Sequence, residues 1–120
     1  MEFKYKKAKD LKERKEESEK VRNEHPGKIC IICEKAPKSQ LPDIEKTKYL
    51  INEEFTLNQF TQIIRKKLKI EKEEALFFLV NGKKSLSGND SMFNIYNQYK
   101  DEDGFLYIAY AAEEVWGYYI

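Results

Sequence analysis

The sequence predicts an α+β domain in which a four-stranded mixed sheet packs on one long central helix. The first observation is the order of the patterns: two apolar, strand-like runs precede the strongest helical pattern, and two more follow it. The second is composition, because 41% hydrophobic and 13% aromatic residues can supply one core in a chain of 120 residues. The third is charge: 22 Lys and Arg balance 21 Asp and Glu, which argues against general disorder and against a wholly basic nucleic-acid binder.

Residues 1–25 are dense in charged side chains and contain one predicted helix. Asp10 is placed to cap a helix that runs to about Asn23, and Glu13, three residues after the cap, completes a capping box. A helix this polar lies on the surface of a domain rather than inside it. The turn residues His25-Pro26-Gly27 then end the helix.

Residues 28–35 predict the first strand, a continuous apolar run that suits a position inside a sheet. Cys30 and Cys33 are three positions apart, so on a strand their thiols point to opposite faces. Two thiols placed in this way cannot share a zinc ion or close a disulfide without breaking the strand. His25 is the only histidine, so we expect no metal site and no cofactor. Two unbridged thiols fit a reducing cytosol.

The next two elements are a short strand and the strongest helix of the sequence. Residues 47–51 predict the strand, and the lysines beside it are typical of an unpaired sheet edge. Thr56 predicts the helix N-cap, and Gln59, at the third helical position, completes a capping box. The apolar stripe expected to face the core is Leu57, Phe60, Ile64 and Leu68.

The last third of the chain predicts a strand, a short helix and a final strand. Residues 75–80 form the third strand, and Asn81-Gly82 after it is a strong hairpin-turn signal. Asp90 or Ser91 can cap a short helix, and residues 105–110 are apolar enough for a strand in the middle of the sheet. Two strands, one long helix and two more strands are the plan of the ubiquitin-like β-grasp.

Several motifs occur in one order along the chain: Glu34-Lys35-Ala36-Pro37, Lys48-Tyr49-Leu50, Phe60 with Ile64-Arg65-Lys66, Ala75-Leu76-Phe77-Phe78, Phe105-Leu106-Tyr107-Ile108-Ala109-Tyr110 and Glu114-Val115-Trp116-Gly117. With them, nearly the whole chain resembles the autophagy ubiquitin-like modifiers, the family of GABARAP and the microtubule-associated protein light chains. Two motifs of the N-terminal extension, Met1-x-Phe3-x-Tyr5-Lys6 and Glu19-Lys20-x-Arg22, resemble the GABARAP branch more closely. The resemblance implies two N-terminal helices within residues 1–26, a ubiquitin-like domain over 27–117 and a tail, 118–120, that processing removes.

The resemblance also implies a conjugation reaction at Gly117. Family members are trimmed after a glycine by a cysteine protease and passed along activating and conjugating enzymes. The glycine carboxylate is then linked to phosphatidylethanolamine. The matching position is Gly117, and a glycine lets an extended tail enter a narrow active site. This chain departs from the family in its tail, where Tyr118-Tyr119-Ile120 put aromatic side chains on the leaving side.

A second implied activity is docking of peptides that carry an aromatic-x-x-aliphatic core, added as a strand to residues 48–52. The aromatic pocket maps to Glu17, Val21, Cys30, Ile32, Lys48, Leu50 and Phe105. The aliphatic pocket maps to Tyr49, Ile51, Phe55, Phe60 and Ile63, of which Ile63 is expected to be partly exposed. The rim that meets acidic flanking residues is Lys28, Lys46 and Lys48. Cys30 and Asn52 are departures, because the family commonly has prolines there.

Three classes of function compete. The first is a lipid-conjugated autophagy modifier that recruits receptors and adaptors, in the cytoplasm and on autophagosome or vesicle membranes. The second, an enzyme, has no nucleophile set or phosphate loop to support it, and acidic pairs such as Glu16-Glu17 are simply solvated charge. The third is a cytosolic peptide-binding or microtubule-associated adaptor without lipidation. Its basic N-terminal surface would attract acidic tubulin tails or anionic lipid.

The N-terminus has no apolar signal-peptide core, and the longest apolar run is too short to span a bilayer.

Overall fold

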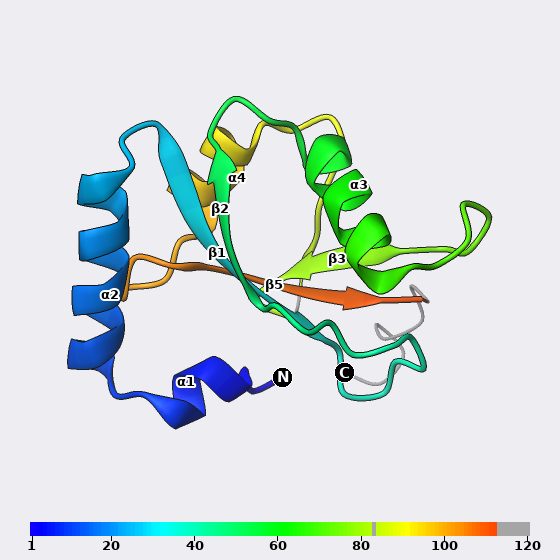
Figure 1. The fold of residues 1–120 in the computed structure, drawn as a ribbon, viewed down its shortest axis with the longest axis horizontal. Helices are drawn as coiled ribbons and strands as arrows, with labels where there is room; N and C mark the ends of the chain where they lie inside the picture. The colour runs from blue at the N-terminus through cyan, green and yellow to red at the C-terminus, as the bar shows by residue number, and fades with distance from the viewer. Residues whose placement is uncertain (83, 113–120) are drawn as a thin grey trace.

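The computed structural model describes residues 1–82 and 84–112, which form a mixed sheet with helices on both faces (Figure 1). The strands are β1 (Lys28–Lys35), β2 (Lys48–Asn52), β3 (Phe77–Val80), β4 (Lys84–Ser85) and β5 (Leu106–Ala111). Their order in the sheet is β2-β1-β5-β3-β4. β1 and β5 are parallel, and every other neighbouring pair is antiparallel. The predicted α+β class and mixed sheet are confirmed, and β5 lies in the middle of the sheet.

The helices are α1 (Lys4–Ala8), α2 (Leu11–Glu24), α3 (Leu57–Leu68) and α4 (Met92–Tyr99). Figure 1 shows α1 and α2 on one side of the sheet and α3 and α4 on the other side. α2 begins as predicted, because the Asp10 carboxylate accepts a hydrogen bond from the Glu13 N–H at 2.9 Å. The two N-terminal helices implied by the resemblance are therefore both present.

The expected number of strands is wrong, because the sheet has a fifth strand, β4. Asn81 and Gly82 adopt positive φ angles of 56° and 72°, as a tight hairpin turn requires. The chain then turns back along β3, and Lys84 pairs with Val80. Both residues of β4 are exposed and polar, so no apolar alternation marks this strand in the sequence.

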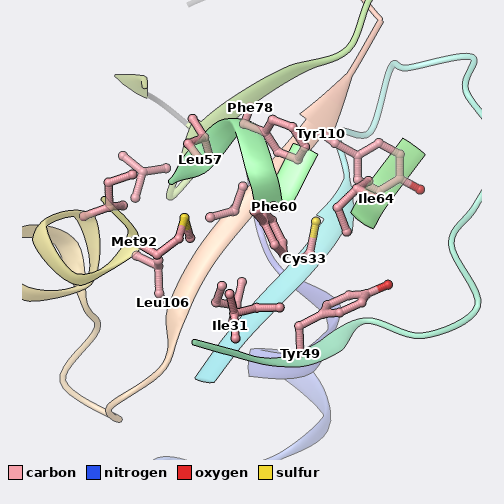
Figure 2. Packing of buried hydrophobic residues seen from close by; sticks show 14 of the residues in the cluster. Ile31, Cys33, Tyr49, Leu57, Phe60, Ile64, Phe78, Met92, Leu106 and Tyr110 are labelled. Atoms are coloured by element: carbon pink, nitrogen blue, oxygen red, sulfur yellow. The ribbon is translucent and has the colours of Figure 1, made fainter. Parts of the chain in front are cut away.

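Two hydrophobic clusters lie on the two faces of the sheet. The larger one packs α3 and α4 against the sheet, and all four predicted stripe residues of α3 are buried in it. Figure 2 shows Phe60 of α3 at its centre; the Phe60 ring lies 5.9 Å from that of Tyr49 and 5.8 Å from that of Phe78. α3 also has the predicted capping box between Thr56 and Gln59. The smaller cluster lies between the sheet and the N-terminal helices.

The two cysteines divide between these clusters, as the strand pattern predicts. Cys33 belongs to the larger cluster and Cys30 to the smaller one, and both thiols are free and buried. Burial raises the pKa of Cys30 to about 11, so its thiol is protonated and unreactive at neutral pH. Within the described residues, no group of acidic, histidine or cysteine side chains is arranged to hold a metal ion, and no helix has the length and apolar character to cross a membrane.

Candidate functional site

β2 is the edge strand that the flanking lysines predict. Within residues 1–82 and 84–112 it pairs with β1 alone, in an antiparallel register that places Ile51 opposite Ile29 and Tyr49 opposite Ile31. The backbone groups on its other side are open to a further strand. An open edge can bind an extended peptide through main-chain hydrogen bonds, with side-chain pockets that select the sequence.

Two hydrogen bonds at the ends of the ladder determine which backbone groups face outward. The Cys33 N–H donates to the Thr47 carbonyl at 2.8 Å, and the Glu53 N–H donates to the Gly27 carbonyl at 3.0 Å. Hydrogen-bonded and non-hydrogen-bonded pairs alternate along an antiparallel ladder, so the odd-numbered residues of β2 bond to β1. The residues whose N–H groups point to the open edge are Lys48, Leu50 and Asn52.

The residues predicted for the aromatic pocket lie together beneath α2. Cys30, Ile32 and Phe105 are almost fully buried in the smaller cluster, and Val21 packs against it from α2. Leu50, opposite Cys30 in the register, is half-buried. The structure therefore brings these residues together, and three of them are buried in the cluster beneath α2.

Glu17 closes the space between α2 and the edge strand. Its carboxylate accepts hydrogen bonds from Lys48 at 2.5 Å, from Lys9 at 3.0 Å and from the Tyr5 hydroxyl. Burial would raise the pKa of Glu17, but these donors outweigh it and hold the pKa down at about 2. Of the acidic pair predicted to be solvated, Glu16 is exposed while Glu17 bridges α2 and β2. The bond between Glu17 and Lys48 therefore joins α2 to the edge strand beside the residues of the predicted aromatic pocket.

The residues predicted for the aliphatic pocket lie on the other face, next to α3. Tyr49, Ile51 and Phe60 are buried in the larger cluster, whereas Phe55 and Ile63 are partly buried at its border. The partial exposure expected for Ile63 is confirmed. Phe60 is 0% exposed and packs against the Tyr49 ring, so it lies in the core and not on the surface where a peptide would bind.

The three lysines predicted for the rim, Lys28, Lys46 and Lys48, are all exposed. The Lys46 ammonium lies 5.5 Å from the centre of the Tyr49 ring, and the Lys48 ammonium lies 5.5 Å from that of Tyr5. These contacts keep two positive charges beside the start of β2. Two clefts of about 630 and 660 Å³ open beside α1, and residues of neither predicted pocket line them.

Sequence reasoning missed the group that fixes α2 beside the site. Asp103, before β5, is 1% exposed and accepts hydrogen bonds from Arg14 at 2.9 Å and from the Tyr107 hydroxyl at 2.5 Å. Ser18, one turn after Arg14, donates to the Asp103 carbonyl. No local pattern indicates this contact, because Arg14 and Asp103 are 89 positions apart.

Gly117 and the tail residues 118–120, predicted as the conjugation and processing site, lie outside the described residues. The sequence alone carries that prediction.

Comparisons with known proteins agree with the fold and with the motifs. The family model described as "Autophagy protein Atg8 ubiquitin like" matches residues 13–117. Autophagy-related protein 8e of Arabidopsis thaliana is 42% identical over 108 residues, which cover 90% of this chain and 88% of that protein. The crystal structure of Trypanosoma brucei ATG8 is similar to this one with a TM-score of 0.89 and 38% identity, and the match covers 94% of this chain and 97% of that one.

Proposed function

The chain belongs to the Atg8 family of autophagy ubiquitin-like proteins, and from this premise we propose that it is a lipid-conjugated modifier with no enzymatic activity of its own. In this proposal a cysteine protease hydrolyses the bond between Gly117 and Tyr118. Activating and conjugating enzymes then carry the Gly117 carboxylate to the amine of phosphatidylethanolamine. The lipidated form acts on autophagosomal membranes, in membrane growth and in the recruitment of receptors and adaptors from the cytoplasm.

The position of Gly117 supports the conjugation step. The family-model match runs to residue 117 and stops before the aromatic tail, Tyr118-Tyr119-Ile120. No helix of the described part of the chain can cross a bilayer. An attached two-chain lipid would supply ~0.8 kcal/mol for each buried CH₂ group, which is enough for stable anchoring. We propose the corresponding division into an N-terminal extension (1–26), a ubiquitin-like domain (27–117) and a removed tail (118–120).

The open edge of β2 is the observation that carries the recruiting activity. The predicted aromatic pocket adjoins Lys48 and Leu50, whereas the aliphatic pocket adjoins Ile51 and Phe55, further along the chain. In an aromatic-x-x-aliphatic motif the aromatic residue comes first, so the peptide runs parallel to β2. Its backbone completes the ladder, and its two anchoring side chains enter pockets on opposite faces of the sheet.

A microtubule-associated adaptor that works through its basic N-terminal surface receives less support. Three lysines of that surface are engaged within the protein: Lys6 pairs with Asp101 at 2.6 Å, Lys7 with Glu2 at 2.9 Å and Lys9 with Glu17 at 3.0 Å. Such pairs reduce the positive charge available to acidic tubulin tails or anionic lipid.

Cell fractionation of variants with opposite expected behaviour tests the proposed function. We expect Gly117→Ala to bind an aromatic-x-x-aliphatic peptide normally while staying in the cytosolic fraction without added lipid mass. We expect Leu50→Ala to be lipidated normally and to lose peptide binding, so each variant is a control for the other. A chain that ends at Gly117 should be conjugated without the protease. Equal membrane recovery and equal mass of wild type and Gly117→Ala would overturn the modifier proposal.

A further inference from the structure

We propose that Asn52 extends the docking edge by one hydrogen bond, which its backbone N–H donates to the carbonyl of the aliphatic residue in the bound motif. This inference rests on the proposed docking of an extended peptide at β2. It makes Asn52 a positioning residue for the far end of the motif, beyond the pocket residues already described.

The predicted pockets and the facing of side chains along β2 together set the position of the peptide. Lys48 is opposite Ile32, which lies in the cluster beneath α2, whereas Ile51 is opposite Ile29, in the cluster beneath α3. Residues opposite each other in a parallel pair point to the same face of the sheet. A motif whose aromatic residue lies opposite Lys48 therefore places its aliphatic residue, three positions later, opposite Ile51. Both anchors then point to the faces where their predicted pockets lie.

The hydrogen bonds follow from this position, because the outward-pointing groups of β2 belong to its even-numbered residues. The peptide residue after the aromatic donates its N–H to the Lys48 carbonyl and accepts from the Leu50 N–H. The aliphatic residue donates its N–H to the Leu50 carbonyl. Its own carbonyl then meets the Asn52 N–H, which also points outward, because the pair of Lys28 and Asn52 is a non-hydrogen-bonded pair.

The local structure of Asn52 holds this donor in place. The Asn52 carbonyl accepts from the Phe55 N–H at 3.0 Å, and its side-chain oxygen accepts from the Glu54 N–H at 2.8 Å. Both bonds tie the residue to the turn that follows β2 and leave its N–H directed at the open edge. A proline at this position would keep the carbonyl but would have no N–H to donate.

The inference is tested by calorimetry with a peptide in which single amide linkages are replaced by esters. An ester after the aliphatic residue weakens the carbonyl that accepts from Asn52, and the N–H that it removes points away from the protein. An ester two linkages further on lies past Asn52, where β2 ends, and it is the matched control. The protein variants are Asn52→Pro, which removes the donor, and Asn52→Ala, which removes only the side-chain bond to Glu54.

We expect the first ester to weaken binding about two- to tenfold in wild type and in Asn52→Ala. This is the change in affinity that corresponds to the net free energy of one hydrogen bond. Asn52→Pro should bind the amide peptide correspondingly more weakly and show no ester effect. The inference would be overturned if the first ester did not weaken binding to wild type, or if it weakened binding to Asn52→Pro by as much as to wild type. The wild-type ester series decides the question even if Asn52→Pro does not fold. Failure of wild type to bind the amide peptide at all would instead overturn the proposed docking function.

Discussion

Replacement of Asp103 by asparagine should destabilise the protein by about 3–5 kcal/mol, the usual result of removing one partner from a buried ion pair. The Asp103 side chain is fully buried, and that of Arg14 is 11% exposed. The guanidinium cannot turn to water freely, because it also donates to the carbonyls of Lys6 and Lys9 at 3.1 and 3.0 Å. The variant leaves Arg14 charged and unpaired, and it puts an amide where the Tyr107 hydroxyl now donates to a carboxylate. A typical domain has only about 5–15 kcal/mol of stability to lose.

Urea unfolding at pH 7 measures this change, and Asp43→Asn is the matched control. Asp43 also pairs with a cation, Lys35, at 3.1 Å, but its side chain is 77% exposed, so we expect a loss below about 1 kcal/mol. Combining Asp103→Asn with Arg14→Met should recover part of the lost stability, because no charge is then left buried without a partner. If Asp103→Asn and Asp43→Asn unfold at similar urea concentrations, the buried pair does not hold the N-terminal helices as we argue.

Three further predictions concern the docking site. Leu50→Ala should weaken binding of an aromatic-x-x-aliphatic peptide by more than about tenfold in calorimetry, because a pocket anchor is lost at the centre of the interface; unchanged affinity would exclude this pocket. Lys46→Glu should mainly slow association and reduce its salt dependence in stopped-flow measurements, since it acts from the rim. Because the folded pKa of Glu17 is about 2, against an ordinary value of 4.5, its contribution to stability is complete above about pH 4.5 and is lost as the pH falls toward 2. Urea midpoints of Glu17→Gln should accordingly vary less with pH over that range than those of wild type.

The elements that the sequence predicted well are those whose signals are local. α3 carries its capping box, Thr56 with Gln59, and its apolar stripe within a single segment, and both are present in the structure. β1 is a continuous apolar run, and its two cysteines face opposite sides as the period of two requires. β4 could not be predicted in this way, because its two polar residues are paired by the preceding turn and not by their own pattern.

The limits of prediction at the candidate site have the same physical origin. The open edge of β2 could be predicted, because its lysines are a local feature of the strand. The bond beside the predicted aromatic pocket joins Glu17 to Lys48 across 31 positions, and the contact that fixes α2 joins Arg14 to Asp103 across 89. Charged residues on a polar helix look alike in sequence, so no pattern separates the solvated Glu16 from the engaged Glu17.

α2 serves both the stability of the fold and access to the aromatic pocket, through two neighbouring rows of side chains. Arg14 and Ser18, four positions apart, bond to Asp103, whereas Glu17 and Val21, also four apart, border the pocket. Because the Asp103 contacts hold the helix, the docking that we propose would place an aromatic side chain in competition with the bond between Glu17 and Lys48 without displacing the helix itself. An acidic residue beside the aromatic one can then replace Glu17 as the partner of Lys48, which offsets the loss. Variants of Asp103 should consequently change stability more than peptide affinity, whereas variants of Glu17 should change both at neutral pH.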